Sequence, residues 1–230
     1  MKKISYTIEN NRAEITMDDG KANAMDFTYF EELNSALAAI ESSGSKTVII
    51  KGRSGFFSGG LDLKLLATLA PTDIARLAET FARAVLRVFL YPIPTIAVCT
   101  GHAIAGGAML AFACDRRYVV DGNYRIQMNE LAIGIPLPSW MLLIGQSAIP
   151  VGVQTEALLH AKSYTPREAH GAGIFHGLIE NGADIDASLN DAVTDLMSLH
   201  MNAYSITKRR LREKAVKEVL AILQDELSSK

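Results

Sequence analysis

The chain has 230 residues, of which 49% are hydrophobic and 21% are charged, so its composition is that of an ordinary globular protein with one large core or two small ones. Its formal net charge of −2 at pH 7 and its pI near 6.2 give no basic excess, which argues against nucleic acid as a partner. No apolar run approaches the roughly 18 residues that a membrane span requires, and no signal-peptide block follows Met1, so we expect a soluble cytoplasmic protein with no membrane partner.

The first fifty residues predict a hairpin, a helix and a buried strand. Residues 4–8 and 13–17 alternate polar and apolar side chains on either side of a polar turn, as the strands of a β-hairpin do. Residues 26–40 then place apolar side chains at helical spacing, and the β-branched run 47–51 predicts a buried strand. A strand, a helix and a strand in this order indicate a crossover unit.

The next part of the chain predicts a second helix and a second buried strand. Residues 72–90 carry one apolar stripe at helical spacing, two prolines end it, and residues 95–99 form another buried strand. A glycine-rich segment, 101–107, opens an apolar helix over 108–114 that must be buried on every side. Residues 118–120 are a third strand candidate.

The character of the sequence changes near residue 166, where helices with polar faces and several glycines begin. Residues 202–227 predict a charged amphipathic helix or a pair of helices. We therefore expect an α/β core over residues 1–165 and a C-terminal helical region over residues 166–230.

Two glycine-rich turns, residues 57–63 and 101–108, follow the two most convincing buried strands. Loops at the carboxyl ends of parallel strands leave backbone amides free for a ligand, and glycine lets the backbone approach it closely. The second turn also opens a helix, whose free N–H groups favour an anion. Two such turns could hold one oxyanion between them, although tight turns and close helix packing account for the same glycines.

Glu130 is the candidate general base, because it is a lone carboxylate in a mostly apolar stretch, residues 127–136. Burial there would raise its pKa toward the range useful for proton transfer. The alternative interpretation is a surface carboxylate or a helix cap.

Other chemistries have little support in the sequence. His102 could be a base, but it lies between a glycine and an alanine in a packed turn, where a histidine is more often structural. Ser58 is not in the G-x-S-x-G pattern of a nucleophilic serine. The histidines and the two cysteines show no ligand spacing, so we expect no metal site.

The chain resembles the crotonase (enoyl-CoA hydratase/isomerase) superfamily over about residues 5–220. Four motifs carry this resemblance: the segment 21–25, the pair of glycine-rich turns, the entry 94–97 to the second turn, and the segment 113–115 after it. The resemblance implies a spiral of ββα turns with a C-terminal helical trimerisation region, assembled as a trimer or a dimer of trimers. It also implies an acyl-CoA substrate, with CoA as the carrier, no further cofactor, and a thioester oxygen held by two backbone amides.

Carried over position by position, the resemblance places those amides at Leu61 and Gly106 and matches Glu130 to a family glutamate. The implied CoA site consists of Lys21, Ala22, Ala24, Ser58, Gly60, Asp62 and Leu63. Further candidates for the CoA and acyl site are Ala105, Gly107, Ile135 and Trp140.

Met109 departs from the family hydratases, which carry a glutamate three residues after the second oxyanion glycine. A thioether cannot exchange a proton, and residues 129–140 resemble the mitochondrial Δ3,Δ2-enoyl-CoA isomerases, which use one base. The sequence therefore favours an isomerase. The alternatives are a hydratase, a thioester hydrolase, or a CoA-thioester-binding protein without catalysis. The basic run 208–212 is interpreted as a solvated helix face in preference to a patch for anionic partners.

Overall fold

The structure is a computed structural model that describes residues 2–228. Its strands are β1 (Ile4–Glu9), β2 (Arg12–Met17), β3 (Thr47–Lys51), β4 (Gly55–Ser58), β5 (Thr95–Cys99), β6 (Gly101–Ile104), β7 (Arg116–Val120), β8 (Ile126–Gln127) and β9 (Gly177–Ile179). Its α-helices are α1 (Phe27–Glu41), α2 (Leu63–Leu66), α3 (Pro71–Phe89), α4 (Gly106–Ala113), α5 (Ser139–Ala148), α6 (Pro166–Gly171), α7 (Ile185–Met197) and α8 (Met201–Ser228), with short helical turns η1 (Leu131–Ile133), η2 (Val151–Val153) and η3 (Thr155–Leu159). Over the described range, no helix has both the length and the apolar character needed to cross a membrane.

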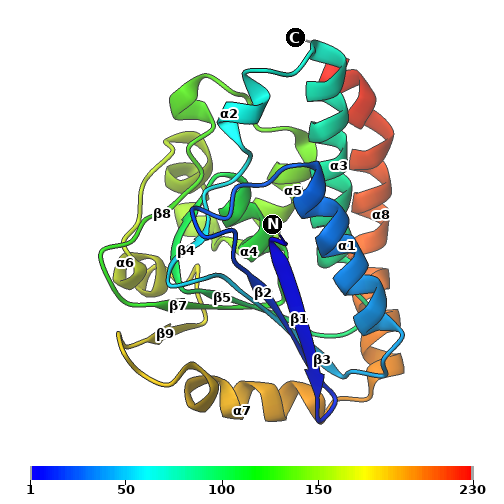
Figure 1. The fold of residues 1–230 in the computed structure, drawn as a ribbon, viewed down its shortest axis with the longest axis vertical. Helices are drawn as coiled ribbons and strands as arrows, with labels where there is room; N and C mark the ends of the chain where they lie inside the picture. The colour runs from blue at the N-terminus through cyan, green and yellow to red at the C-terminus, as the bar shows by residue number, and fades with distance from the viewer. Residues whose placement is uncertain (1, 229–230) are drawn as a thin grey trace.

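From β3 onward, successive strands of the described chain alternate between two sheets. In the described residues, six strands form a large sheet in the order β1-β2-β3-β5-β7-β9, parallel except for the β1–β2 pair. The strands β4, β6 and β8 form a small parallel sheet. The first turn of the spiral adds both of its strands, β1 and β2, to the large sheet, and each of the next three turns adds one strand to each sheet and then helical structure. The helix α8 runs along α3 on the outside (Figure 1). The predicted spiral of ββα turns with a helical C-terminal region is confirmed.

The long predicted elements lie close to their expected bounds. The runs 47–51 and 95–99 are β3 and β5, and every side chain of β5 is buried. The predicted hairpin and helices correspond to β1, β2, α1, α3, α4 and a single long α8. The glycine-rich turns contain the short strands β4 and β6, which the sequence did not predict. The boundary after residue 165 stays a prediction, and beyond it β9 pairs with β7.

Two glycines allow β4, β6 and α4 to approach more closely than any side chain would permit. A methyl group on Gly101 would lie 1.9 Å from the carbonyl carbon of Gly55, and one on Gly107 would lie 2.1 Å from the carbonyl oxygen of Ser58. Neither position can accept a Cβ atom without a shift of the main chain. These contacts bring the carboxyl end of β4 against the start of α4.

Asp115, just after α4, ties α8 to the core. Its carboxylate accepts hydrogen bonds from the backbone N–H of Thr95 (2.8 Å), from Lys208 Nζ (2.6 Å) and from Arg212 Nη1 (2.8 Å). Burial opposes the ionisation of Asp115, but Lys208 and Arg212 outweigh this effect and lower its pKa. The ammonium of Lys208 is itself buried, so the two charges depend on each other.

The basic run 208–212 is therefore not a solvated helix face throughout, and that interpretation was wrong for two of its residues. Lys208 and Arg212, four residues apart on α8, share the face that packs on the core. The guanidinium of Arg212 also lies 4.2 Å from the centre of the Phe89 ring. Their partner Asp115 is distant in the sequence, so spacing along the helix alone could not reveal the pairing.

We expect Asp115→Asn to lower the free energy of unfolding by about 3 to 5 kcal/mol at pH 7, because it leaves the buried ammonium of Lys208 without an anion. Urea denaturation of both proteins measures the difference. Because the pKa of Asp115 is lowered in the folded state, the difference should shrink as pH falls below about 4. The control is Glu218→Gln, at an exposed pair with Lys214, which should change stability by under about 0.5 kcal/mol. Equal effects of the two substitutions would contradict the role of Asp115.

Candidate active site

The candidate site lies where the three strands of the small sheet end. The strand β6 pairs with β4 on one side and with β8 on the other, and all three run parallel. Beyond β6, the backbone N–H of Ala105 donates to the carbonyl oxygen of Gln127 at 2.8 Å. Leu61, Gly106 and Glu130, the predicted catalytic residues, each follow the end of one of these three strands by two or three residues.

The two glycine-rich turns meet directly. Gly60 has a positive φ of 84°, and a Cβ atom on it would lie 3.0 Å from the backbone nitrogen of Gly106 and 3.1 Å from the carbonyl oxygen of Ile104. Ala105 also has a positive φ, 50°, at the residue that precedes α4. The sharp turn at Ala105 aims the start of α4 at Gly60, so the predicted convergence of these turns is present in the structure.

Leu61 and Gly106 each carry a backbone N–H that the fold leaves free. Met25 donates to the carbonyl oxygen of Gly60 and accepts from the N–H of Asp62, both at 2.9 Å. Leu61 lies between these two bonds, so its own N–H points away from Met25. Gly106 is the first residue of α4, where helix N–H groups lack internal acceptors. Within residues 2–228, neither N–H has a hydrogen-bond acceptor.

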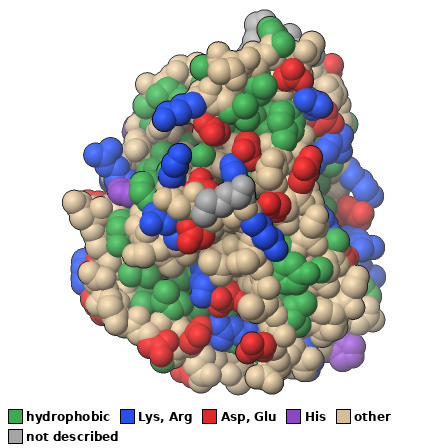
Figure 2. Space-filling view, in the orientation of Figure 1, with side chains coloured by type: hydrophobic (Ala, Val, Ile, Leu, Met, Phe, Trp, Pro, Cys, Tyr) green, Lys and Arg blue, Asp and Glu red, His purple; other side chains and the backbone are tan. Residues whose placement is uncertain are grey.

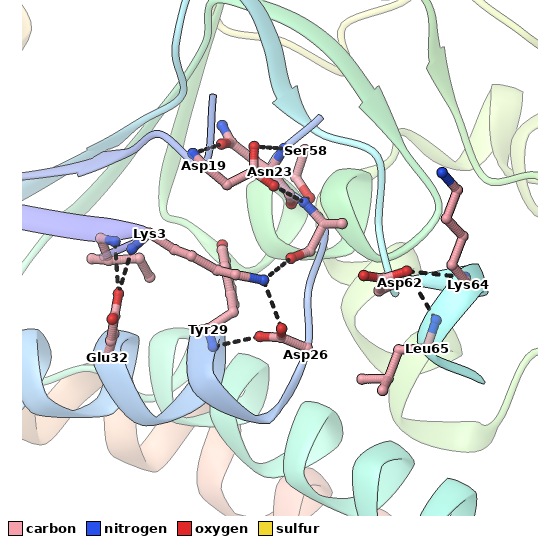
Figure 3. Close-up of polar contacts among 12 residues, drawn as sticks. Lys3, Asp19, Asn23, Asp26, Tyr29, Glu32, Ser58, Asp62, Lys64 and Leu65 are labelled. Carbon is pink, nitrogen blue, oxygen red and sulfur yellow. Dashed lines mark hydrogen bonds and ion pairs between the residues drawn. The ribbon is translucent and has the colours of Figure 1, made fainter. Parts of the chain in front are cut away.

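A network of buried polar groups fixes the turn after β4 against the segment 19–25. The hydroxyl of Ser58 donates to the carbonyl oxygen of Asn23 at 2.7 Å and accepts from the N–H of Gly60 at 3.1 Å. The side-chain amide of Asn23 donates to the carbonyl oxygens of Met17 and Phe57. Figure 3 shows Asn23 between Asp19 and Ser58. Asn23 is thus a supporting residue that the sequence analysis missed.

A cavity of about 480 Å³ opens along these two segments. Its walls are formed by Lys3, Asp19, Lys21, Ala22, Ala24, Gly59, Gly60, Leu61, Asp62, Leu63 and Lys64. It brings together the two predicted loops, 21–24 and 60–63. Lys3, Asp19, Gly59 and Lys64 were not among the predicted site residues. The pairing of β1 with β2, together with hydrogen bonds from Lys3 Nζ to the carbonyl oxygen of Ala24 (3.2 Å) and to Asp26 (2.7 Å), brings Lys3 to this wall.

Charged groups surround the cavity, and several of them are already engaged. The carboxylate of Asp19 accepts from the N–H groups of Lys21, Asn23 and Ala24, and although burial opposes ionisation, these bonds lower its pKa. Asp62 accepts from the first N–H groups of α2 (Figure 3). Among the described residues, the ammonium groups of Lys21 and Lys64 form no ion pair with any carboxylate. Figure 2 shows lysine and arginine side chains mixed with acidic ones on this face of the molecule.

Glu130 is a buried carboxylate that forms no ion pair with any described residue. The side chain follows β8, is only 6% exposed, and its Oε2 atom has no hydrogen-bond partner there. Burial raises the pKa of Glu130 to about 7. Its carbonyl oxygen accepts from the N–H of Ile135 at 2.9 Å, which fixes the backbone around it. The surface interpretation of Glu130 is wrong, because its side chain is buried.

The other predicted site residues lie beside or behind the cavity. Ser58 is fully buried, and Ala105 and Gly107 flank Gly106 at the start of α4. Trp140 is 2% exposed, whereas Ile135 is 37% exposed. The described residues that line the cavity include neither of them. Met109 is fully buried one turn into α4 and brings no acid to the site.

Comparisons with known proteins give one consistent result. A family model described as enoyl-CoA hydratase/isomerase matches residues 7–228. A probable enoyl-CoA hydratase of Bacillus subtilis is 34% identical over 137 residues, and the human mitochondrial enoyl-CoA delta isomerase 1 is 25% identical over 194 residues. The crystal structure of an enoyl-CoA hydratase/isomerase family protein from Pseudomonas syringae is 26% identical, with a TM-score of 0.91 over 98% of this chain and 97% of that one.

The sequence alignments cover only part of each relative. The match to the Bacillus subtilis protein spans 59% of this chain and 53% of that protein, and the match to the human protein spans 83% and 64%. The chain therefore spans somewhat more than half the length of these relatives. One of them is named a hydratase and the other an isomerase.

Proposed function

The chain belongs to the enoyl-CoA hydratase/isomerase family, and from that premise we propose that it shifts the double bond of a 3-enoyl-CoA into conjugation with the thioester, with Glu130 as the only base. The observation that carries this proposal is the buried carboxylate of Glu130, whose Oε2 atom has no hydrogen-bond partner in the described chain. Its segment follows β8, which pairs with the strand that leads to the free N–H of Gly106. Such a carboxylate is poised to exchange a proton next to a forming anion.

The cavity supports an acyl-CoA as the ligand. It runs along the loops 21–24 and 60–63 and includes Gly60, which packs against the turn that carries Gly106. The free ammonium groups of Lys21 and Lys64 would meet the phosphates of CoA. Small residues, Ala22, Ala24, Gly59 and Gly60, form part of the remaining wall and leave room for a long, flexible carrier.

In the proposed reaction, the carbonyl oxygen of the thioester accepts hydrogen bonds from the N–H groups of Leu61 and Gly106. The ionised carboxylate of Glu130 removes a proton from C2, and the electrons move onto the thioester oxygen to give a dienolate. The two N–H groups and the positive end of α4 stabilise the negative oxygen. Glu130 then returns the proton to C4, which leaves the double bond between C2 and C3.

Met109 is the reason to favour isomerisation over hydration. Addition of water by the hydratases of this family uses two glutamates, and the second of those positions holds a buried thioether here. A single carboxylate can move one proton between two carbons of the same substrate, but it cannot also activate a water molecule at the same time.

We expect the purified protein to convert 3-hexenoyl-CoA into the conjugated 2-enoyl product and to hydrate crotonyl-CoA much more slowly. Absorbance of the conjugated thioester follows the first reaction, and incorporation of isotopically labelled water follows the second. Faster hydration than isomerisation would favour a hydratase. Binding of both thioesters without turnover would favour a protein that has lost catalysis.

Three further expectations stay predictions. These are the assembly of the chain as a homotrimer or a dimer of trimers, its cytoplasmic location, and the absence of any cofactor other than CoA as the carrier of the substrate.

A further inference from the structure

The space beside the proposed oxyanion site is occupied by buried aromatic side chains. A methyl group on Gly106 would lie 2.8 Å from Cζ of Phe81 and 3.4 Å from Sδ of Met25. The edge of the Phe81 ring therefore touches the very residue whose N–H is free for a ligand. An acyl chain that starts at a carbonyl bound by Gly106 begins next to this ring.

Phe81 belongs to a group of three packed rings, Phe30, Phe81 and Trp140, which we call the aromatic wall. Phe81 stacks on Phe30 with ring centroids 5.6 Å apart and meets Trp140 edge to face at 4.9 Å. Each of the three side chains is at most 2% exposed. Rings packed in this way have few alternative positions, because the core around them is dense.

Two of the helices that carry the aromatic wall, α3 and α5, are held from outside by α8. The carboxylate of Glu226, near the end of α8, accepts hydrogen bonds from the backbone N–H and the hydroxyl of Ser139, which precedes Trp140. The same helix is anchored beside α3 by Arg212, which donates to the carbonyl oxygen of Phe89. Displacing the wall would therefore break contacts on α3, α5 and α8 together.

None of the three rings of the aromatic wall lines the cavity, whose walls, as far as the described residues show, come from Lys3 and the segments 19–24 and 59–64. The cavity is therefore open along the segments that are proposed to hold CoA. Beside Gly106, by contrast, the buried side chains of Phe81 and Met25 take up the space.

We propose that the aromatic wall limits the length of the acyl group, so that the site takes short-chain acyl-CoA thioesters and excludes long-chain ones. This inference rests on the proposed function, because it assumes that the thioester carbonyl binds at Gly106. Phe81 is the specificity-determining residue, since its ring edge lies nearest to the position that a Cβ atom on Gly106 would take.

Two measurements test the inference. Calorimetric titration compares the affinities for butanoyl-CoA and dodecanoyl-CoA, and this measurement does not depend on catalysis. Steady-state assays compare kcat/KM for 3-hexenoyl-CoA and 3-dodecenoyl-CoA. We expect the wild-type protein to favour the shorter thioester in both. Phe81→Leu removes the ring edge. It should raise the ratio of kcat/KM for 3-dodecenoyl-CoA to kcat/KM for 3-hexenoyl-CoA by about tenfold or more.

The matched control is Phe89→Leu, another buried phenylalanine on α3, whose ring lies against Arg212 instead of Gly106. Thermal melts show whether the two variants lose similar stability. An unchanged ratio in Phe89→Leu together with a shifted ratio in Phe81→Leu supports the inference. It is overturned if the wild-type protein binds dodecanoyl-CoA as tightly as butanoyl-CoA, or if both variants leave the ratio unchanged. Selective binding without isomerase activity would support the aromatic wall while refuting the proposed reaction.

Discussion

Glu130→Gln is expected to reduce kcat for the double-bond shift by about 10² to 10⁴-fold, the usual contribution of a positioned general base. The amide keeps the size of the side chain but cannot accept the C2 proton. Because the side chain is buried at the end of the small sheet, the substitution leaves the surface and the cavity wall unchanged. Spectrophotometric assay of 3-hexenoyl-CoA gives kcat, and calorimetric titration with butanoyl-CoA should show nearly unchanged binding.

The pH dependence distinguishes a base from a structural carboxylate. Because burial raises the pKa of Glu130 to about 7, kcat should rise with pH through that value and level off above it. Stability should change in the opposite sense. The folded pKa lies above the ordinary 4.5, so the unfolded chain binds fewer protons, and the free energy of unfolding falls as pH rises from about 4.5 through 7. Glu130→Gln should remove both effects. Full activity in this variant would refute the proposed role.

Leu61→Pro should lower kcat by about 10² to 10³-fold, because it deletes one of the two N–H groups proposed to hold the thioester oxygen. The backbone bonds from Met25 to Gly60 and from Asp62 to Met25 do not use that N–H, so the local pairing can persist. Kinetics on 3-hexenoyl-CoA measure the loss, and circular dichroism confirms the fold.

The matched control is Leu61→Ala, which shortens the same side chain and keeps the N–H. It should retain kcat to within about tenfold, since the proposed contact is made by the main chain. If the proline and alanine variants lose kcat equally while both remain folded, the side chain of Leu61 matters for activity and its backbone N–H does not. That result would contradict the proposed hydrogen bond from Leu61 to the thioester oxygen.

The sequence predicted the parts of the fold in which one local pattern decides the structure. The strands β3 and β5 are continuous apolar runs, and α3 has a single apolar stripe, so their positions follow from periodicity. The strands β4 and β6 escaped prediction because each is short and contains or adjoins glycine, and only their mutual pairing stabilises them.

The same distinction applies to the site. Glu130 could be found from the sequence, because a lone acid in an apolar stretch is unusual, and its burial bears out that reasoning. Lys3 and Phe81 could not be found, because one reaches the cavity through the β1–β2 pairing and the other meets Gly106 only after α3 packs across α4. Contacts between distant segments depend on the tertiary fold, which no local spacing encodes.

The most direct test of the central claim is an experimental structure of the protein with butanoyl-CoA bound. We expect a thioester oxygen within about 2.7 to 3.1 Å of the backbone nitrogens of both Leu61 and Gly106. We also expect the carboxylate of Glu130 to be the acidic group in contact with C2 of the acyl chain. A thioester oxygen bound elsewhere would contradict the proposed oxyanion site, and a second acid against the acyl carbons would contradict Glu130 as the only base.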